Sequence, residues 1–303
     1  MMDTAVAARA VGGAVVGASV RFRRVTTDTR ALHPDDLFVA LSGERFDGHD
    51  FVAAALAGGA AAALIARPHA TGACGNLVVV DDTLVALGAL AGFWRTRFDI
   101  PLVVVTGSNG KTTTKEMIGA IFRAAEGDSG VAATPGNFNN SIGLPLALLG
   151  LRASHRLGVF EIGMNHRGET RELARIAQPT IAVITNAQRE HQEFMRTVDE
   201  VAAEHADAIA SLRHGGRAVI NADDPRAGIW CAAAAAAGAS VLTFGLDGTA
   251  DVHGRLDEGP SGGTLDVETP RGRVTALLRV PGRHMASNAL AAAAAAEAAG
   301  VPI

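Results

Sequence analysis

Cysteine is scarce in this chain of 303 residues, and positive charge is not in excess. Cys74 and Cys231 are too few for a disulfide framework, and neither has the spacing of a CxxC or Cys/His zinc site. The formal net charge of −4 argues against nucleic acid held by bulk electrostatics. These shortages indicate a protein of a reducing, cytoplasmic setting with no nucleic-acid partner.

Long apolar runs are also missing. No stretch reaches the roughly 18 uninterrupted apolar residues that span a bilayer, and the alanine runs at 232–237 and 291–296 are better read as helix. Asp3 stands where a signal peptide has positive charge, and Arg9 interrupts the apolar candidate near the N-terminus. We therefore expect a globular protein without membrane insertion.

The apolar pattern divides the chain into two predicted domains, residues 1–99 and 100–303. The boundary lies where Asp99, Ile100 and Pro101 interrupt a predicted helix just before a buried strand. In the first domain the pattern predicts strands at 37–41, 62–66 and 77–80 and helices at 50–56 and 83–98.

After the boundary, near-continuous apolar strands alternate with helices, which is typical of a parallel sheet covered on both faces. Gly-rich alternating segments, for example 264–267 and 273–280, predict appended β-hairpins. The other predicted elements are strands at 102–106, 157–162, 180–185 and 217–220 and helices at 112–125, 169–177, 197–212 and 287–299.

A phosphate-binding loop is predicted within VVVTGSNGKTTT, residues 103–114. Glycines let backbone N–H groups face an anion, and the following helix adds its positive end. Lys111 would reach the β- and γ-phosphates of a nucleotide, and the Thr112 hydroxyl would bind Mg²⁺. Val105 replaces the first glycine of the standard spacing, so this is a shorter TGxxGKT variant, and a Gly turn with an incidental lysine is the alternative. The predicted fold is α/β, with a small N-terminal α/β substrate domain and a P-loop-type, mostly parallel ATPase domain carrying β-hairpins.

Acid and histidine at neighbouring strand ends suggest a metal site, because ligands gather at the carboxyl ends of parallel strands. Glu161 ends an apolar strand, which favours Mg²⁺ binding over a structural salt bridge. His191 lies in the polar segment after the next strand and is either a surface residue or part of that site. His205 occupies a core-facing position of helix 197–212, which suits a buried histidine as well as a catalytic one.

Several polar regions are candidate substrate contacts. The loop TPGNFNNSIGLP, residues 134–145, offers neutral donors and acceptors that suit a sugar or a diphosphate. In the first domain, TDTR (27–30) and SGERFDGHDF (42–51) are dense in Asp, Arg and His. An ordinary turn remains the alternative for each of them.

In chain order these segments resemble the Mur ligase family. The strings that carry the resemblance are TTDTRALHPDDLFVALSGERFDGHDF, TGSNGKTTTKEM, ATPGNFNNSIGLPLALL, FEIGMNHRGE, TNAQREHQEF, NADDP and GRHMASNALAAA. They extend over nearly the whole chain, and several are specific to the family.

The resemblance implies a monomeric, ATP-dependent ligase of peptidoglycan precursor synthesis that joins D-alanyl-D-alanine to UDP-N-acetylmuramoyl-tripeptide through an acyl phosphate. It implies ATP and Mg²⁺, with Thr112 and Glu161 at one metal ion, Glu161 and His191 at a second, and Lys111, His191 and Glu161 in catalysis. The residues implied at the nucleotide are Gly107, Ser108, Asn109, Gly110, Lys111, Thr112, Thr113, Asn186 and Asn288. Those implied at the precursor are Asp28, Arg30, Gly43, Glu44, Arg45, Asp47, His49, Asn137, Asn139 and Asn140.

Two departures from the family pattern affect these expectations. Family members commonly carry a lysine, carbamylated in several, at the position of His205, so His205 or Glu204 would complete the second metal site directly. A third, C-terminal domain that closes over ATP does not lie within the 303 residues, so we expect ATP and precursor binding with little ligation. The alternatives are a ligase that acts on the UDP-muramoyl dipeptide, a relative like folylpolyglutamate synthase, and a non-catalytic nucleotide-binding fragment.

Overall fold

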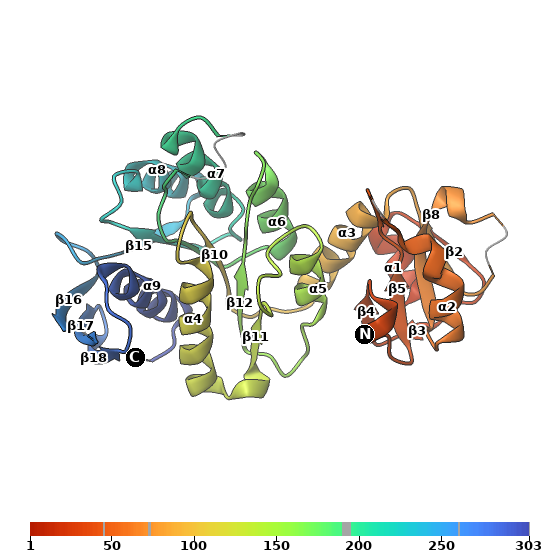
Figure 1. The fold of residues 1–303 in the computed structure, drawn as a ribbon, viewed down its shortest axis with the longest axis horizontal. Helices are drawn as coiled ribbons and strands as arrows, with labels where there is room; N and C mark the ends of the chain where they lie inside the picture. Colours follow the sequence, from red (N-terminus) through yellow and green to blue (C-terminus); the bar gives the residue numbers. More distant parts are fainter. Residues whose placement is uncertain (45, 72–73, 190–194, 260, 303) are drawn as a thin grey trace. The chain divides into compact units, whose positions relative to one another are not determined.

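A computed structural model describes residues 1–44, 46–71, 74–189, 195–259 and 261–302 (Figure 1). The chain divides into two compact units. Unit 1 comprises Met1–Phe98 and Ser141–Leu151, and unit 2 comprises Asp99–Asn140 and Arg152–Ile303. No sequence pattern indicated that the segment 141–151 returns to the first unit.

Unit 1 is built on a five-stranded sheet. The strands described in unit 1 are β1 (Met2–Asp3), β2 (Ala14–Val16), β3 (Arg21–Phe22), β4 (Arg24–Thr26), β5 (Asp36–Val39), β6 (Ser42–Gly43), β7 (Phe46–Asp47), β8 (Ala62–Ala66) and β9 (Leu77–Val80), of which β1 pairs with β3 and β6 with β7 in separate two-stranded sheets. The sheet has the order β2-β9-β8-β5-β4, and within it only β2 pairs antiparallel. The strands β5, β8 and β9 are apolar and buried, as their sequences predicted.

The helices of unit 1 pack on this sheet and on one another. They are α1 (Thr4–Val11), α2 (Val52–Ala57), α3 (Thr83–Arg95) and α5 (Gly143–Leu149). Asp82 caps α3 by accepting hydrogen bonds from the backbone N–H groups of Leu84 and Val85. Trp94 Nε1 on α3 donates a hydrogen bond to Leu151 O at 3.1 Å, which ties the returning segment to the unit.

Unit 2 contains a nine-stranded sheet. Its strands are β10 (Leu102–Thr106), β11 (Val131–Ala133), β12 (Leu157–Glu161), β13 (Ile181–Ile184), β14 (Arg217–Asn221), β15 (Ser240–Gly245), β16 (Val252–Gly259), β17 (Gly262–Thr269) and β18 (Gly272–Leu278). The order is β11-β12-β10-β13-β14-β15-β16-β17-β18, parallel from β11 to β16 and antiparallel beyond. The predicted hairpins therefore extend the main sheet, and the α/β fold with a mostly parallel sheet is confirmed.

Helices cover both faces of the large sheet (Figure 1). They are α4 (Lys111–Glu126), α6 (Glu169–Ala177), α7 (Val198–Ala210), α8 (Ala227–Ala237) and α9 (Arg283–Ala299). Figure 1 shows α4 and α9 side by side on one face and α6, α7 and α8 on the other. The alanine run 291–296 is buried within α9, and that helix begins four residues before its predicted start. Within the described ranges, no helix has the length and apolarity needed to cross a bilayer.

Candidate functional site

The predicted phosphate loop joins β10 to α4. All five residues of β10 are buried, so the strand fixes the loop's origin in the core. Gly107 and Gly110 have backbone φ angles of +132° and +80°, which residues with a side chain rarely adopt. A Cβ on Gly107 would lie 2.1 Å from Thr185 Oγ1, and one on Gly110 would lie 2.3 Å from Asn288 Oδ1. The loop therefore requires glycine at both positions.

A second segment, 185–188, holds the phosphate loop from the adjacent strand end. Asn186 Oδ1 accepts from Asn109 N and Asn186 Nδ2 donates to Asn109 O, both at 3.0 Å. Ser108 N donates to Asn186 O, and Gln188 N donates to Ser108 Oγ at 2.8 Å. The amides of Ser108 and Asn109 are thus used within the protein, so an anion would meet chiefly the amides at the start of α4. No sequence motif had singled out Gln188.

Lys111 lies at the first position of α4, at the positive end of the helix dipole. Its Nζ donates hydrogen bonds to Gly107 O and to Ser108 O, so in this structure the ammonium group folds back on its own loop. The next residue, Thr112, directs its hydroxyl to Glu161.

Glu161 ends β12 beside β10 and is only 2% exposed. Its Oε2 accepts from Thr112 Oγ1 and its Oε1 accepts from Asn139 Nδ2, each at 2.8 Å. Its backbone N donates to Thr134 Oγ1 at 3.1 Å. A buried carboxylate with neutral partners only is costly in free energy, whereas carboxylate and hydroxyl oxygens are the ligands of hard divalent cations.

The three residues expected near a second metal ion, His191, His205 and Glu204, do not all lie beside Glu161 among the described contacts. His191 lies outside the described residues. His205 is buried on α7, and its Nδ1 lies 3.0 Å from Thr106 Oγ1 at the end of β10. Glu204 points elsewhere, because both its oxygens accept from Gly168 N and Oε1 also accepts from Thr170 N. Glu204 therefore caps the start of α6, and its part in a metal site stays a prediction.

A cavity of about 890 Å³ opens beside the phosphate loop. It brings together Asn186 and Asn288, as expected, with the acidic residues Asp223, Asp224 and Asp247. The remaining lining residues are Asn109, Gly110, Thr113, Ala187, Gln188, Asn221, Pro225, Leu246, Arg283, His284, Met285 and Ser287. This set extends from the phosphate loop to the N-terminus of α9.

The loop 134–140, called the asparagine loop below, carries the three candidate residues Asn137, Asn139 and Asn140, and only Asn139 contacts Glu161. Asn139 is half-buried and contacts Glu161, and its backbone O accepts from Gly163 N at 2.9 Å. Asn137 and Asn140 are exposed. The loop thus offers one residue to the Glu161 site and two to solvent.

In unit 1, Asp28 and Arg30 form an exposed bidentate pair, with a shortest N–O distance of 2.8 Å. The side chain and backbone amide of Arg30 lower the pKa of Asp28 to about 2. The pair lines a cavity of about 550 Å³ together with exposed Phe46 and Phe51, whose ring centroids are 5.8 Å apart, and with Thr27, Thr29 and Phe38. Charge beside aromatic rings suits a ligand with both a flat ring and polar groups.

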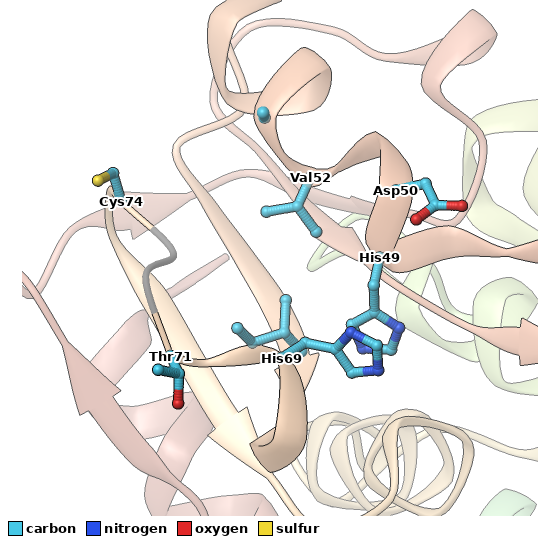
Figure 2. Close-up of a pocket in the computed structure, with 8 residues that line it drawn as sticks. His49, Asp50, Val52, His69, Thr71 and Cys74 are labelled. Carbon is cyan, nitrogen blue, oxygen red and sulfur yellow. The ribbon is translucent and has the colours of Figure 1, made fainter.

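The segment 42–51 also contributes to a histidine cluster beside a cavity of about 490 Å³ (Figure 2). His49 Nδ1 lies 2.6 Å from Asp47 Oδ1, and Ala66 N donates to His49 Nε2 at 2.9 Å. Figure 2 shows the His69 ring stacked on that of His49, with centroids 3.8 Å apart. The N–H groups of His49, backbone first and ring second, lower the pKa of Asp47 to about 2.

Asp47, His49 and His69 place three potential ligand atoms within 4.8 Å of one another. Because His49 Nε2 accepts from Ala66 N, Nδ1 must carry the proton and has no lone pair for a metal. The side chain of His49 is also only 3% exposed. Both ring nitrogens of His49 are therefore used inside unit 1, although the residue also lines the cavity of about 490 Å³ together with His69. Gly43 and Glu44 are exposed, and Arg45 lies outside the described residues.

Comparison with known proteins agrees with this arrangement. The family model "Mur ligase middle domain" matches residues 105–296, and "Mur ligase family, catalytic domain" matches residues 21–95. UDP-N-acetylmuramoyl-tripeptide–D-alanyl-D-alanine ligase of Escherichia coli (strain K12) is 36% identical over 94% of this chain and 62% of its own length. The enzyme of the same name from Synechocystis sp. is 39% identical over 93% and 59%.

Solved structures give the same likeness. MurF from Acinetobacter baumannii superposes with a TM-score of 0.90 at 32% identity, over 100% of this chain and 66% of that one. MurF ligase from Thermotoga maritima in complex with ADP has a TM-score of 0.81 at 28% identity, over 93% and 64%. The chain spans about three fifths of the length of the curated relatives it matches.

Proposed function

The chain belongs to the Mur ligase family, and from this premise we propose that it carries the nucleotide- and precursor-binding part of a UDP-N-acetylmuramoyl-tripeptide–D-alanyl-D-alanine ligase. The observation that carries the proposal is the buried Glu161 carboxylate bonded to Thr112, the residue after Lys111. The proposed setting is the cytoplasm, where ATP and the soluble UDP precursor are available.

ATP is the proposed nucleotide. Its triphosphate would lie on the α4 amides with Lys111 turned toward it, and its nucleoside would occupy the cavity shared by Asn186 and Asn288. The remaining loop contacts would come from Gly107, Ser108, Asn109, Gly110, Thr112 and Thr113. Support comes from the glycine conformations and from the ADP complex of the Thermotoga maritima relative.

Mg²⁺ fits the donor set present. Thr112 Oγ1 and Glu161 provide oxygen ligands, and the carboxylate is buried without a cationic partner among the described residues. Bound there, the ion would neutralise charge on the transferring phosphoryl group. His191, outside the described residues, is the proposed further ligand, and buried His205 would contribute at the same strand edge.

The proposed reaction has two steps. A carboxylate oxygen of the precursor attacks the γ-phosphorus of ATP, which forms an acyl phosphate and releases ADP. The amine of D-alanyl-D-alanine then attacks the acyl carbon, expels phosphate and loses a proton to form the amide. Lys111 would screen the repulsion between the carboxylate and the triphosphate, which is the main barrier to their approach.

The precursor is proposed to bind to unit 1. Asp28 and Arg30 line a cavity with aromatic walls that suits the uridine diphosphate part. Exposed Gly43 and Glu44 are the other proposed contacts there, with Arg45 beyond the described residues. The precursor contacts expected of Asn137 and Asn140, on the asparagine loop of unit 2, stay predictions. Asp47 and His49 shape the segment from within.

Calorimetry tests the proposal with Mg-ATP and with the UDP-muramoyl tripeptide and dipeptide. We expect both ATP and the tripeptide to bind, the tripeptide more tightly than the dipeptide. Lys111→Ala should lose ATP but keep the precursor. Preference for the dipeptide would support the dipeptide ligase instead, and ATP binding without either precursor would support a non-catalytic nucleotide-binding module.

A further inference from the structure

Lysine is unusually rare in this chain. Among its 27 lysines and arginines only two are lysines, Lys111 and Lys115, one turn apart on α4. Lys111 belongs to the phosphate loop, whereas no role has been given to Lys115. Its side chain is completely buried, which for an ammonium group requires compensating partners.

Three oxygens surround the Lys115 ammonium group. Nζ donates to Thr134 O at 3.0 Å and to Gly136 O at 2.9 Å, and Glu116 Oε1 lies at 2.7 Å. Three donors on one nitrogen match three acceptors grouped around a point. A planar guanidinium has its donors in a fixed fork and does not fit such a site, which explains lysine here in a chain that otherwise uses arginine.

The two carbonyls belong to the start of the loop 134–140, which also contacts Glu161. Thr134 Oγ1 accepts from Glu161 N, and Asn139 Nδ2 donates to Glu161 Oε1. Asn139 is further held by the hydrogen bond from Gly163 N to its backbone O. Glu161 is thus fixed by Thr112 on α4 and by a loop that Lys115 fastens to the same helix.

We propose that Lys115 is a positioning residue, which ties the loop 134–140 to α4 so that Asn139 and Thr112 hold the Glu161 carboxylate between them. The effect on metal binding rests on the proposed function, because Glu161 is the proposed Mg²⁺ ligand. The effect on the loop does not, and the two can be measured separately.

The first measurement is hydrogen exchange without any ligand. In Lys115→Met, which keeps the side-chain length but has no donor, the amides of Asn139 and Gly163 should exchange at least about tenfold faster than in the wild type. Lys115→Arg should show the same effect. Glu116→Gln is the matched control, because Glu116 is more than half exposed and both carbonyl bonds of Lys115 remain. Unchanged exchange in Lys115→Met, or normal exchange in Lys115→Arg, would overturn the proposal.

The second measurement is ADP binding at increasing Mg²⁺. Outer partners of metal ligands typically alter metal affinity 10–100-fold, so Lys115→Met should raise the half-saturating Mg²⁺ concentration about tenfold. Binding in EDTA should stay within about twofold. Because Lys115 acts through Asn139, Asn139→Ala should have a similar effect, and the double variant should add little. If the two substitutions together raised the half-saturating Mg²⁺ concentration by the product of their separate effects, Lys115 would not act through Asn139.

The outcomes separate the two proposals. If the wild type showed no Mg²⁺-dependent ADP binding, the proposed function would be refuted. The hydrogen-exchange measurement would still decide whether Lys115 positions the loop. Should Lys115→Met fail to fold, Lys115→Leu, which also has no donor, takes its place. Normal exchange at Asn139 and Gly163 in that variant would equally overturn the proposal.

Discussion

Gly110 offers the sharpest test of the phosphate-loop geometry, because the chain contains a matched control. Gly110 precedes α4 with φ +80° and ψ −2°, and Gly168 precedes α6 with φ +90° and ψ −13°. A Cβ at Gly110 would lie 2.3 Å from Asn288 Oδ1, whereas one at Gly168 would meet nothing within 4 Å. Alanine at the two positions therefore meets the same backbone penalty in different surroundings.

The expected magnitudes follow from that contrast. Left-handed backbone costs a residue with a Cβ about 1–2 kcal/mol, and both variants share this loss of unfolding free energy. Asn288 is only 7% exposed, so its displacement by the Gly110→Ala methyl group adds the roughly 1–3 kcal/mol typical of overpacking. For a unit of this size the additional loss corresponds to a melting temperature roughly 5 °C lower than in Gly168→Ala.

Thermal and urea unfolding of both variants, followed by circular dichroism, gives the comparison, and ADP titration gives the functional readout. Gly110→Ala should lose ADP binding and Gly168→Ala should retain it. Adding Asn288→Ala to Gly110→Ala should recover the stability lost through overpacking but not the backbone penalty. Equal stability of the two single variants would refute the reasoning, because it would mean that Asn288 does not press on the loop.

Further predictions concern Glu161 and the histidine cluster. Glu161→Gln should weaken Mg²⁺-dependent ADP binding at least about tenfold and leave binding in EDTA unchanged; equal losses in calorimetry with and without Mg²⁺ would contradict a metal role. The pKa of Asp47 is lowered from 3.8 to about 2, so its carboxylate stabilises unit 1 above pH 3.8 and this contribution disappears as the pH falls to about 2. Asp47→Asn should flatten that part of the urea-stability profile, and an unaltered slope would count against it. His49→Ala should destabilise unit 1 by about 2–4 kcal/mol, while His69→Ala, whose side chain is 43% exposed, should cost under about 1 kcal/mol. Excess Zn²⁺ should not raise the melting temperature of the wild type, and a clear rise would show that the cluster binds metal.

The sequence was sufficient to predict the strand, loop and helix around the phosphate loop, because the residues that specify them are neighbours in the chain. β10 is an unbroken apolar run, and the Gly-Lys-Thr turn that follows it allows little besides a strand, a loop and a helix. The placement of Glu161 beside Thr112 also followed from a general rule, since the carboxyl ends of neighbouring parallel strands meet at one edge.

The features that sequence did not reveal depend on partners distant in the chain. Asn288 meets Gly110 across 178 positions, and Gln188 meets Ser108 across 80. The family resemblance of segment 42–51 suggested His49 as a precursor contact, but it could not show that Ala66 N, 17 positions away, donates to His49 Nε2. No sequence pattern singled out Lys115, because nothing local shows that its side chain enters the core and donates to two carbonyls.

The contacts of Lys111 define what a nucleotide has to change on binding. The backbone of the loop is already fixed by Asn186, whose side chain pairs with both the N–H and the C=O of Asn109. Lys111, by contrast, satisfies its ammonium group on Gly107 O and Ser108 O. Triphosphate oxygens would replace these neutral acceptors with charged ones, and hydrogen bonds between charged groups are about twice as strong as neutral ones. Binding therefore requires one side chain to turn while the surrounding backbone keeps its position, which limits the ordering entropy lost when the phosphates enter.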